Sequence, residues 1–327
     1  MLRLIPCLTM GLILVSCTRQ PSSQISTIGG TCLAPDRCSS PAVLVVGIRE
    51  GSPEVTLGSG LIVRTENGTL RLLTAGHVVN NGMDAWLALP TRHPRLDQRT
   101  ASRWQADLLA GYRSGSYADY VLPVIRYFDG IDRPGDDAGI DFALAELPPI
   151  WQSAVAEERV LALPMRFDLR PEELSQLIQQ RPGGETFSIV SGGINDTCGQ
   201  AGYLCVSHID HQQLRPAMTR RGSPARIVDM DTAADHQVSI RNGALLLDDS
   251  LLGDRLSGQP VRLSGGDSGA ALIMSDNDAD YVVAIYHGNF RETTRTFSVP
   301  GALPGVRNQN ELENRMEVVW RAPDPCL

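Results

Sequence analysis

The chain has 327 residues, 42% of them hydrophobic, which is enough apolar sequence to bury the core of one large domain or of two smaller ones. Its formal net charge is -8, and no basic stripe interrupts the acidic balance. Nucleic acid is therefore excluded as an expected partner.

The first 17 residues have the pattern of an export signal, with Arg3 ahead of a short apolar run that ends in small residues. The run is too short to span a bilayer, so we expect it to be cleaved. Its end, Leu14-Val15-Ser16-Cys17, resembles a bacterial lipobox, in which the cysteine is lipidated. That resemblance implies a lipoprotein of the bacterial cell envelope, facing the periplasm or on the outer membrane, anchored through Cys17. A plain secretory signal with an incidental cysteine is the alternative.

Residues 18–40 are rich in Ser, Thr, Gln and Gly, which predicts a flexible spacer. The chain has seven cysteines, and an exported chain can keep disulfides. Cys198 and Cys205 flank a short turn, so we expect them to pair, with a stabilisation of about 2.5 kcal/mol. The pairing among Cys32, Cys38 and Cys326 stays open.

Short apolar runs separated by turns predict a first β-barrel over residues 41–150. Asn67-Gly68 is a hairpin signal that leads into the strand before His77. Extra loops are expected around residues 92–102 and 129–139. Strands are expected over residues 42–48, 56–63, 84–89, 106–109, 120–127 and 142–147.

Residues 151–185 break the β pattern and form a connector, in which residues 171–180 have the proline, early acids and apolar spacing of a short helix. A second barrel with the C-terminal segment is expected over residues 186–327. Its strands are predicted from residue 187 and over residues 225–228, 238–240 and 244–247. Residues 308–320 fit a closing helix, although residues 316–320 fit a strand equally well. We interpret His208, Asp210 and His211 as a solvated turn, and we expect no metal and no cofactor.

Three motifs contain residues suited to nucleophilic catalysis. Ser268 stands in Gly-Gly-Asp-Ser-Gly, where Gly266 can adopt backbone angles closed to other residues and turn its N–H toward that of Ser268. His77 follows an apolar run and small residues, and Asp141 heads a second apolar segment. Taken singly, each of the three residues also fits an ordinary turn or core position.

Together, in the order His, Asp, Ser, the motifs resemble the trypsin/chymotrypsin superfamily of serine proteases. Thr-Ala-Gly-His77 is similar to the family's Thr-Ala-Ala-His, Asp141-Phe-Ala-Leu to its Asp-Ile-Ala-Leu, and Gly-Asp-Ser268-Gly is the same tetrapeptide. Residues 189–193, 282–288 and 304–306 are weaker matches in the same order. The resemblance implies an all-β fold of two six-stranded antiparallel β-barrels, with an inserted helix between them and a possible C-terminal helix.

The resemblance also implies roles for these residues. His77 is expected to be the base, Asp141 its orienting carboxylate and Ser268 the nucleophile, with the oxyanion held by the N–H groups of Gly266 and Ser268. The expected activity is a serine endopeptidase that cleaves protein or peptide substrates through an acyl-enzyme. An inactive protease-fold binding module of the envelope and a serine esterase are the alternatives.

Two further expectations concern the surroundings of Ser268. Family spacing puts Arg262 at the floor of the substrate pocket and Tyr286, His287 and Gly288 on its wall. A basic floor favours a Glu or Asp side chain, unless Arg262 faces solvent or pairs with a nearby acid. Residues 28–32 match poorly the new N-terminus that activated trypsins insert beside the residue before the nucleophile. If no such insertion occurs, Asp267 needs another partner, because an unpaired buried carboxylate is costly.

Overall fold

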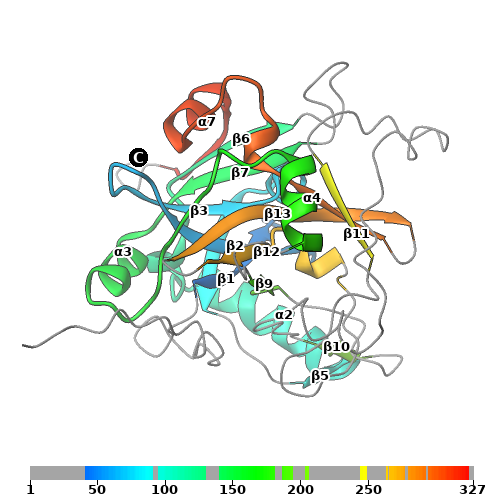
Figure 1. The fold of residues 1–327 in the computed structure, drawn as a ribbon. Coiled ribbons are helices and arrows are strands. Elements are labelled where there is room, and N and C mark those ends of the chain that lie inside the picture. The colour runs from blue at the N-terminus through cyan, green and yellow to red at the C-terminus, as the bar shows by residue number, and fades with distance from the viewer. Residues whose placement is uncertain are drawn as a thin grey trace, which may run out of the picture.

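The computed structural model, shown in Figure 1, describes most of the two expected barrels. It describes residues 41–90, 95–129, 140–180, 186–193, 203–205, 244–248, 263, 265–276, 279–291 and 294–323. The expectations for the signal, the spacer, Cys17, Cys198, residues 208–211, Arg262 and Cys326 lie outside these residues, as does the side chain of Cys205. They therefore stay predictions.

The first half of the chain forms an antiparallel sheet that curls until its ends meet. Its strands follow the order β6-β7-β3-β2-β1-β4. An isolated antiparallel bridge from Leu87 in β4 to Val121, just before β6, links the two ends of this order. The strands are β1 (Ala42–Ile48), β2 (Val55–Arg64), β3 (Leu70–Thr74), β4 (Ala85–Pro90), β6 (Val124–Asp129) and β7 (Asp141–Glu146).

The second half forms a separate antiparallel sheet of five strands in the order β11-β14-β13-β12-β9. These strands are β9 (Thr186–Val190), β11 (Ala244–Asp248), β12 (Ala271–Ser275), β13 (Asp280–Arg291) and β14 (Thr294–Ser298). Two curled antiparallel sheets with few helices confirm the expected all-β, chymotrypsin-like double-barrel class. In Figure 1, β13 and β12 overlap β2 and β1, and buried residues of these four strands share one apolar cluster, so the two sheets pack against each other.

A layer of apolar side chains from both sheets fills the seam between them. Val63 and Leu73 of the first sheet share a buried cluster with Ile273 and Ile285 of the second. The short strand β8 (Leu163–Pro164) also crosses the seam, because it pairs in parallel with β2 while the next residue, Met165, bridges to Val282. The relative position of the barrels is therefore fixed by packing and by backbone pairing.

The inserted helix is confirmed as α4 (Pro171–Gln180), whose Leu174 and Ile178 are buried in the core of the second sheet. A second connector helix, α3 (Pro149–Ala156), was not expected; its Trp151 is buried and donates to the Ala88 carbonyl at 2.9 Å. No helix in the described part of the chain has both the length and the apolar character needed to cross a membrane.

The loop expected at residues 92–102 and the strand expected at residues 106–109 are wrong, since β5 (Arg95–Asp97) leads into α2 (Gln98–Arg113). Leu108 and Leu109 pack on the outer face of β1 and β4. A short apolar run such as residues 106–109 reads equally as a strand or as one side of a helix. In Figure 1, α2 lies in the lower half, next to β5 and its partner β10 (Tyr203–Cys205).

The C-terminal run divides into both of the elements considered for it. Asn308 caps α7 (Gln309–Arg315) by accepting from the Glu311 N–H at 2.9 Å, and β15 (Glu317–Arg321) follows. Because β15 pairs with β6, the end of the chain adds a strand to the first sheet. The short helices α1 (Gly76–Val79), η3 (Ala118–Tyr120), η5 (Gly265–Asp267) and η6 (Pro300–Ala302) complete the described elements.

Two leucine-to-alanine variants test the role of α4. Leu174 is fully buried in the second core, whereas Leu161 in the connector is 41% exposed. We expect Leu174→Ala to lower the free energy of unfolding by about 2–5 kcal/mol, because it opens a cavity. Leu161→Ala should change it by less than about 0.5 kcal/mol. Urea unfolding measures both, and equal losses would contradict the assigned packing of α4.

Candidate active site

His77 lies in a helical turn at the end of a strand. β3 ends at Thr74, and α1 begins two residues later, with Val78 and Val79 buried in the first core. These two valines hold the turn against the barrel. The His77 side chain is 42% exposed, so one edge of its ring is open to solvent.

Asp141 is the first residue of β7, and its side chain is fully buried. β7 pairs with β3, which brings the start of β7 close to the end of β3. One carboxylate oxygen, Oδ2, lies 2.5 Å from His77 Nδ1, and the other, Oδ1, accepts from the His77 backbone N–H at 2.9 Å. This two-point contact fixes both the position and the tautomer of the imidazole, leaving Nε2 free to act as an acceptor.

Gly76 lies directly against Asp141 and Tyr127. A Cβ at Gly76 would overlap the Asp141 carboxylate and the Tyr127 ring. The missing side chain lets the carboxylate approach the backbone of α1 closely enough to accept the His77 N–H. We conclude that Gly76 belongs to the His77–Asp141 contact.

Ser268 follows the turn η5 and is 4% exposed. The next residue, Gly269, has a φ of +93°, which disfavours any side chain, and its N–H donates to the Tyr286 carbonyl at 2.8 Å. The Ala270 N–H closes the turn on the Asp267 carbonyl at 2.8 Å. The loop that carries Ser268 is thereby tied to β13.

Ser59 of β2 connects this loop to the His77 segment across the seam. Its N–H donates to the Ser268 carbonyl at 2.7 Å, and its carbonyl accepts from the Thr74 hydroxyl at 2.6 Å. Thr74 is three residues before His77. The sequence-predicted residues His77, Asp141 and Ser268 are thus brought to one region between the barrels, the first two in direct contact.

The special backbone angle in the loop that carries Ser268 lies at Gly269, not at Gly266 as expected. Gly266 is part of the 3-10 turn Gly265–Asp267. In such a turn the N–H groups point in one direction along the axis, toward carbonyls three residues back. The N–H groups of Gly266 and Ser268 therefore do not converge until the Gly265–Gly266 peptide turns over, a change that two glycines permit.

Ser298 and His287 form a second layer behind Asp141, which the sequence did not predict. Ser298 Oγ accepts from the Asp141 N–H at 3.0 Å and lies 2.6 Å from His287 Nδ1. Burial lowers the pKa of His287 from 6.5 to about 4; His77 adds to the lowering and Asp141 opposes it. His287 is therefore neutral near pH 7, and its Nδ1 can accept the Ser298 hydroxyl proton.

The expected pocket residues divide into three cases. Tyr286 is 1% exposed, packs on Phe297 in the second core and donates to Asn289 at 2.6 Å, so its side chain lines no open pocket. Gly288 has open space where a Cβ would stand, which fits a pocket wall. His287 lies between these two residues, against Ser298, and Arg262 is outside the described residues.

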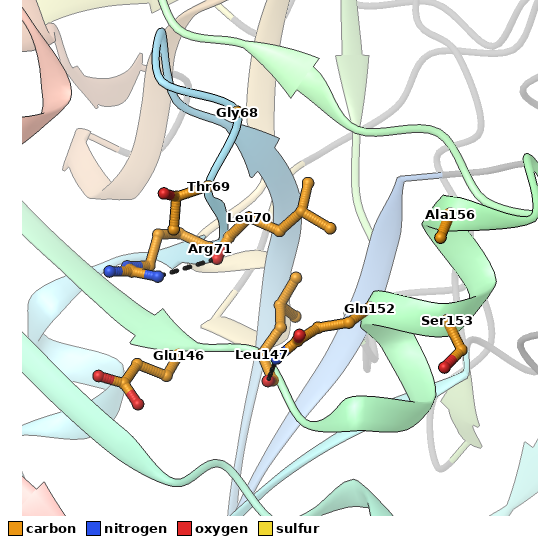
Figure 2. Close-up of a pocket in the computed structure, with 9 residues that line it drawn as sticks. All are labelled: Gly68, Thr69, Leu70, Arg71, Glu146, Leu147, Gln152, Ser153 and Ala156. Carbon is orange, nitrogen blue, oxygen red and sulfur yellow. Dashed lines mark hydrogen bonds between the residues drawn. The ribbon is translucent and has the colours of Figure 1, made fainter.

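A separate cavity of about 520 Å³ lies at the other end of β3 and β7 (Figure 2). Figure 2 shows it between the turn before β3 and helix α3. Arg71 on its rim pairs with Glu313 at 3.1 Å. No predicted catalytic residue lines this cavity, so we do not assign the chemistry to it. Its lining residues are Gly68, Thr69, Leu70, Arg71, Glu146, Leu147, Gln152, Ser153 and Ala156.

Among the described residues, no group of three or more His, Cys, Asp or Glu side chains is arranged to hold a metal ion. The chemistry available at the seam is that of an imidazole, a carboxylate and a hydroxyl.

No protein-family model matches the sequence, and no curated protein matches it either. Solved structures do match, with low identity. The protease Anisep from Arthrobacter nicotinovorans is 12% identical over 88% of this chain and 97% of that chain, with a TM-score of 0.44. The thermostable serine protease AL20 from an extremophilic microorganism is 14% identical over 81% and 93%, with a TM-score of 0.41.

The lowered pKa of His287 predicts a pH dependence of stability. Between about pH 4 and 6.5 the unfolded chain binds a proton at His287 that the native protein does not, so stability falls as the pH falls through this window. The loss should reach about 3 kcal/mol by pH 4. We expect urea unfolding of His287→Gln at pH 7, 5.5 and 4 to show a shallower decline than that of the wild type. Parallel declines would contradict the lowered pKa of His287.

Proposed function

We propose that the protein is a serine endopeptidase that uses His77, Asp141 and Ser268. The observation that carries this proposal is the two-point contact between the buried Asp141 carboxylate and His77. A carboxylate that accepts both the ring Nδ1–H and the backbone N–H of one histidine leaves Nε2 as a proton acceptor at the seam. Ser268 supplies the hydroxyl in that seam.

In this proposal His77 Nε2 removes the hydroxyl proton as Ser268 Oγ attacks the carbonyl carbon of a peptide bond. The imidazolium that forms is stabilised by Asp141, and it then gives its proton to the departing amine. His77 then takes a proton from a water molecule as that water attacks the acyl-enzyme, and it returns a proton to Ser268 Oγ as the ester bond breaks. Asp141→Asn would favour the wrong tautomer and lower turnover by about ten-thousandfold.

The oxyanion is expected at the N–H groups of Gly266 and Ser268, once the Gly265–Gly266 peptide has turned from its helical position. One such donor contributes about 3 kcal/mol to stabilisation of the transition state. Part of the rate acceleration therefore depends on rotation of the Gly265–Gly266 peptide. Binding of a substrate beside Ser268 would favour that change, because only the turned peptide offers both donors.

Specificity for Glu or Asp stays part of the proposal and depends on Arg262. His287 would contribute a hydrogen-bond donor rather than a charge near pH 7, because its pKa is lowered to about 4. Gly288 leaves open space beside it. A cleavage profile with apolar or small residues before the scissile bond would argue against this preference.

Two alternative functions are distinguished by simple measurements. An inactive binding module would keep the barrels, but would give no reason for a buried carboxylate aligned on an exposed histidine. A serine esterase would use the same residues, although the order of the triad and the lack of a Gly-x-Ser-x-Gly motif argue against the common esterase scaffold. Casein and short-chain esters offered to the same preparation separate protease from esterase.

Covalent labelling tests the nucleophile. We expect wild-type protein to react with a fluorophosphonate probe and Ser268→Ala to show no labelling, because the probe needs an activated hydroxyl. Ser153→Ala is the matched control, since Ser153 is exposed on α3 and lines only the separate cavity. Gel fluorescence measures the label, and labelling that persists in Ser268→Ala would refute the assignment.

We also propose that the protein acts as a lipoprotein of the bacterial cell envelope, on the strength of the signal that ends at Cys17. In that case Cys17→Ser should move the protein from the membrane fraction to the soluble fraction of a bacterial host, because lipid attachment needs the thiol. Immunoblots of the two fractions measure this. Unchanged membrane fractionation would remove the anchor from the account.

A further inference from the structure

Ser191 and Asp267 form a buried contact directly beside the nucleophile. The Ser191 hydroxyl donates to Asp267 Oδ1 at 2.8 Å, and both residues are fully buried. Ser191 Oγ also accepts from the Gly193 N–H at 3.1 Å, which fixes the direction in which its own proton points. The carboxylate that precedes Ser268 is therefore held by a residue just beyond β9, within the described chain.

Ser59 completes this arrangement from the other barrel. Besides donating its N–H to the Ser268 carbonyl, Ser59 accepts the Gly192 N–H at its hydroxyl oxygen at 2.8 Å. Ser59 is fully buried as well. One side chain and its backbone thus connect β2 to Ser268 and to the Ser191–Gly193 segment at the same time.

We propose that Ser191 and Ser59 are positioning residues that set the nucleophile loop from within the uncleaved chain. Ser191 holds Asp267, and Ser59 holds both Ser268 and the segment that carries Ser191. The account rests on the function proposed above. With residues 267–269 held in this way, the Gly265–Gly266 peptide is the part of the loop left to adjust when the oxyanion forms.

This arrangement bears on how the activity is controlled. The carboxylate of Asp267 already has a donor in the folded chain, so holding it does not require a newly cut N-terminus. Because the hydrogen bond reaches a charged group, it is of the stronger kind and is costly to remove without replacement. Holding Asp267 therefore does not depend on cleavage of the chain, and the change at the Gly265–Gly266 peptide is the step that remains between the folded loop and the pair of oxyanion donors.

Four variants and two readouts test the brace, by which we mean the hydrogen bonds that Ser59 and Ser191 make to the Ser268 loop and to each other's segments. Ser191→Ala should slow fluorophosphonate labelling of Ser268 at least tenfold, whereas Ser191→Thr, which keeps a hydroxyl, should stay nearer the wild-type rate. Thr65→Ala is the matched control, because it removes a buried hydroxyl that donates to the Thr69 carbonyl at the far end of the β2–β3 hairpin. We expect it to label at the wild-type rate.

The second readout is hydrogen exchange of the peptide that covers residues 265–271, which does not depend on catalysis. Exchange should increase in Ser191→Ala and not in Thr65→Ala, because only the former frees the loop. Labelling of Ser191→Ala at the wild-type rate, or unchanged exchange in that peptide, overturns the proposal. If the wild-type protein does not label at all, the proposed protease function is wrong. Hydrogen exchange over residues 265–271 then tests the positioning role of Ser191 by itself.

Ser59→Ala carries the same expectation and covers the case in which Ser191→Ala does not fold. It removes the acceptor of the Gly192 N–H while keeping the Ser59 N–H that binds the Ser268 carbonyl. We expect slower labelling and increased exchange over residues 265–271. Wild-type values in both readouts would again overturn the proposal.

Discussion

A fully buried carboxylate at Asp141 is the constraint around which the site is arranged. Removing a carboxylate from water costs several kcal/mol unless well-aligned donors replace the lost hydration. Here both oxygens are used by one histidine, through its ring and its backbone. The glycine at position 76, the pairing of β3 with β7 and the Ser298 hydroxyl behind the Asp141 N–H all serve that contact.

The groups of the site come from separate parts of the chain and meet at the seam between the barrels. His77 and Asp141 belong to the first sheet, and Ser268 precedes the first residue of β12 in the second. Ser59 joins them by contacts to both sides. The apolar cluster across the seam fixes the position of one sheet relative to the other. A small displacement of either barrel would therefore change the distance between the Ser268 hydroxyl and the His77 imidazole.

The sequence predicted the three central residues because their chemistry demands particular side chains within short local motifs. It also placed β1 over residues 42–48 and α4 over residues 171–180, where apolar spacing and punctuating residues agree. It failed at α2, since a short apolar run does not distinguish a strand from a helix that covers the outer face of β1 and β4. The helix is favoured by the packing of Leu108 and Leu109 on β1 and β4, a tertiary contact that the local sequence pattern does not encode.

The positioning serines could not have been found in the same way. Ser59 and Ser191 each lie beside glycines, and Ser298 ends a strand, so each reads locally as an ordinary small polar residue. Their partners stand 133, 76 and 157 residues away along the chain. Their roles follow only from folding, because a hydroxyl acquires a function from the donor or acceptor that the fold places against it.

A crystal structure of the protein after reaction with a fluorophosphonate tests the central claim most directly. The account predicts phosphorus bonded to Ser268 Oγ, with the His77 Nε2 about 2.6–3.2 Å from an oxygen of the adduct. The Gly265–Gly266 peptide should be turned so that the N–H groups of Gly266 and Ser268 face the phosphoryl oxygen. An adduct on another residue, or His77 held away from Ser268, would contradict it.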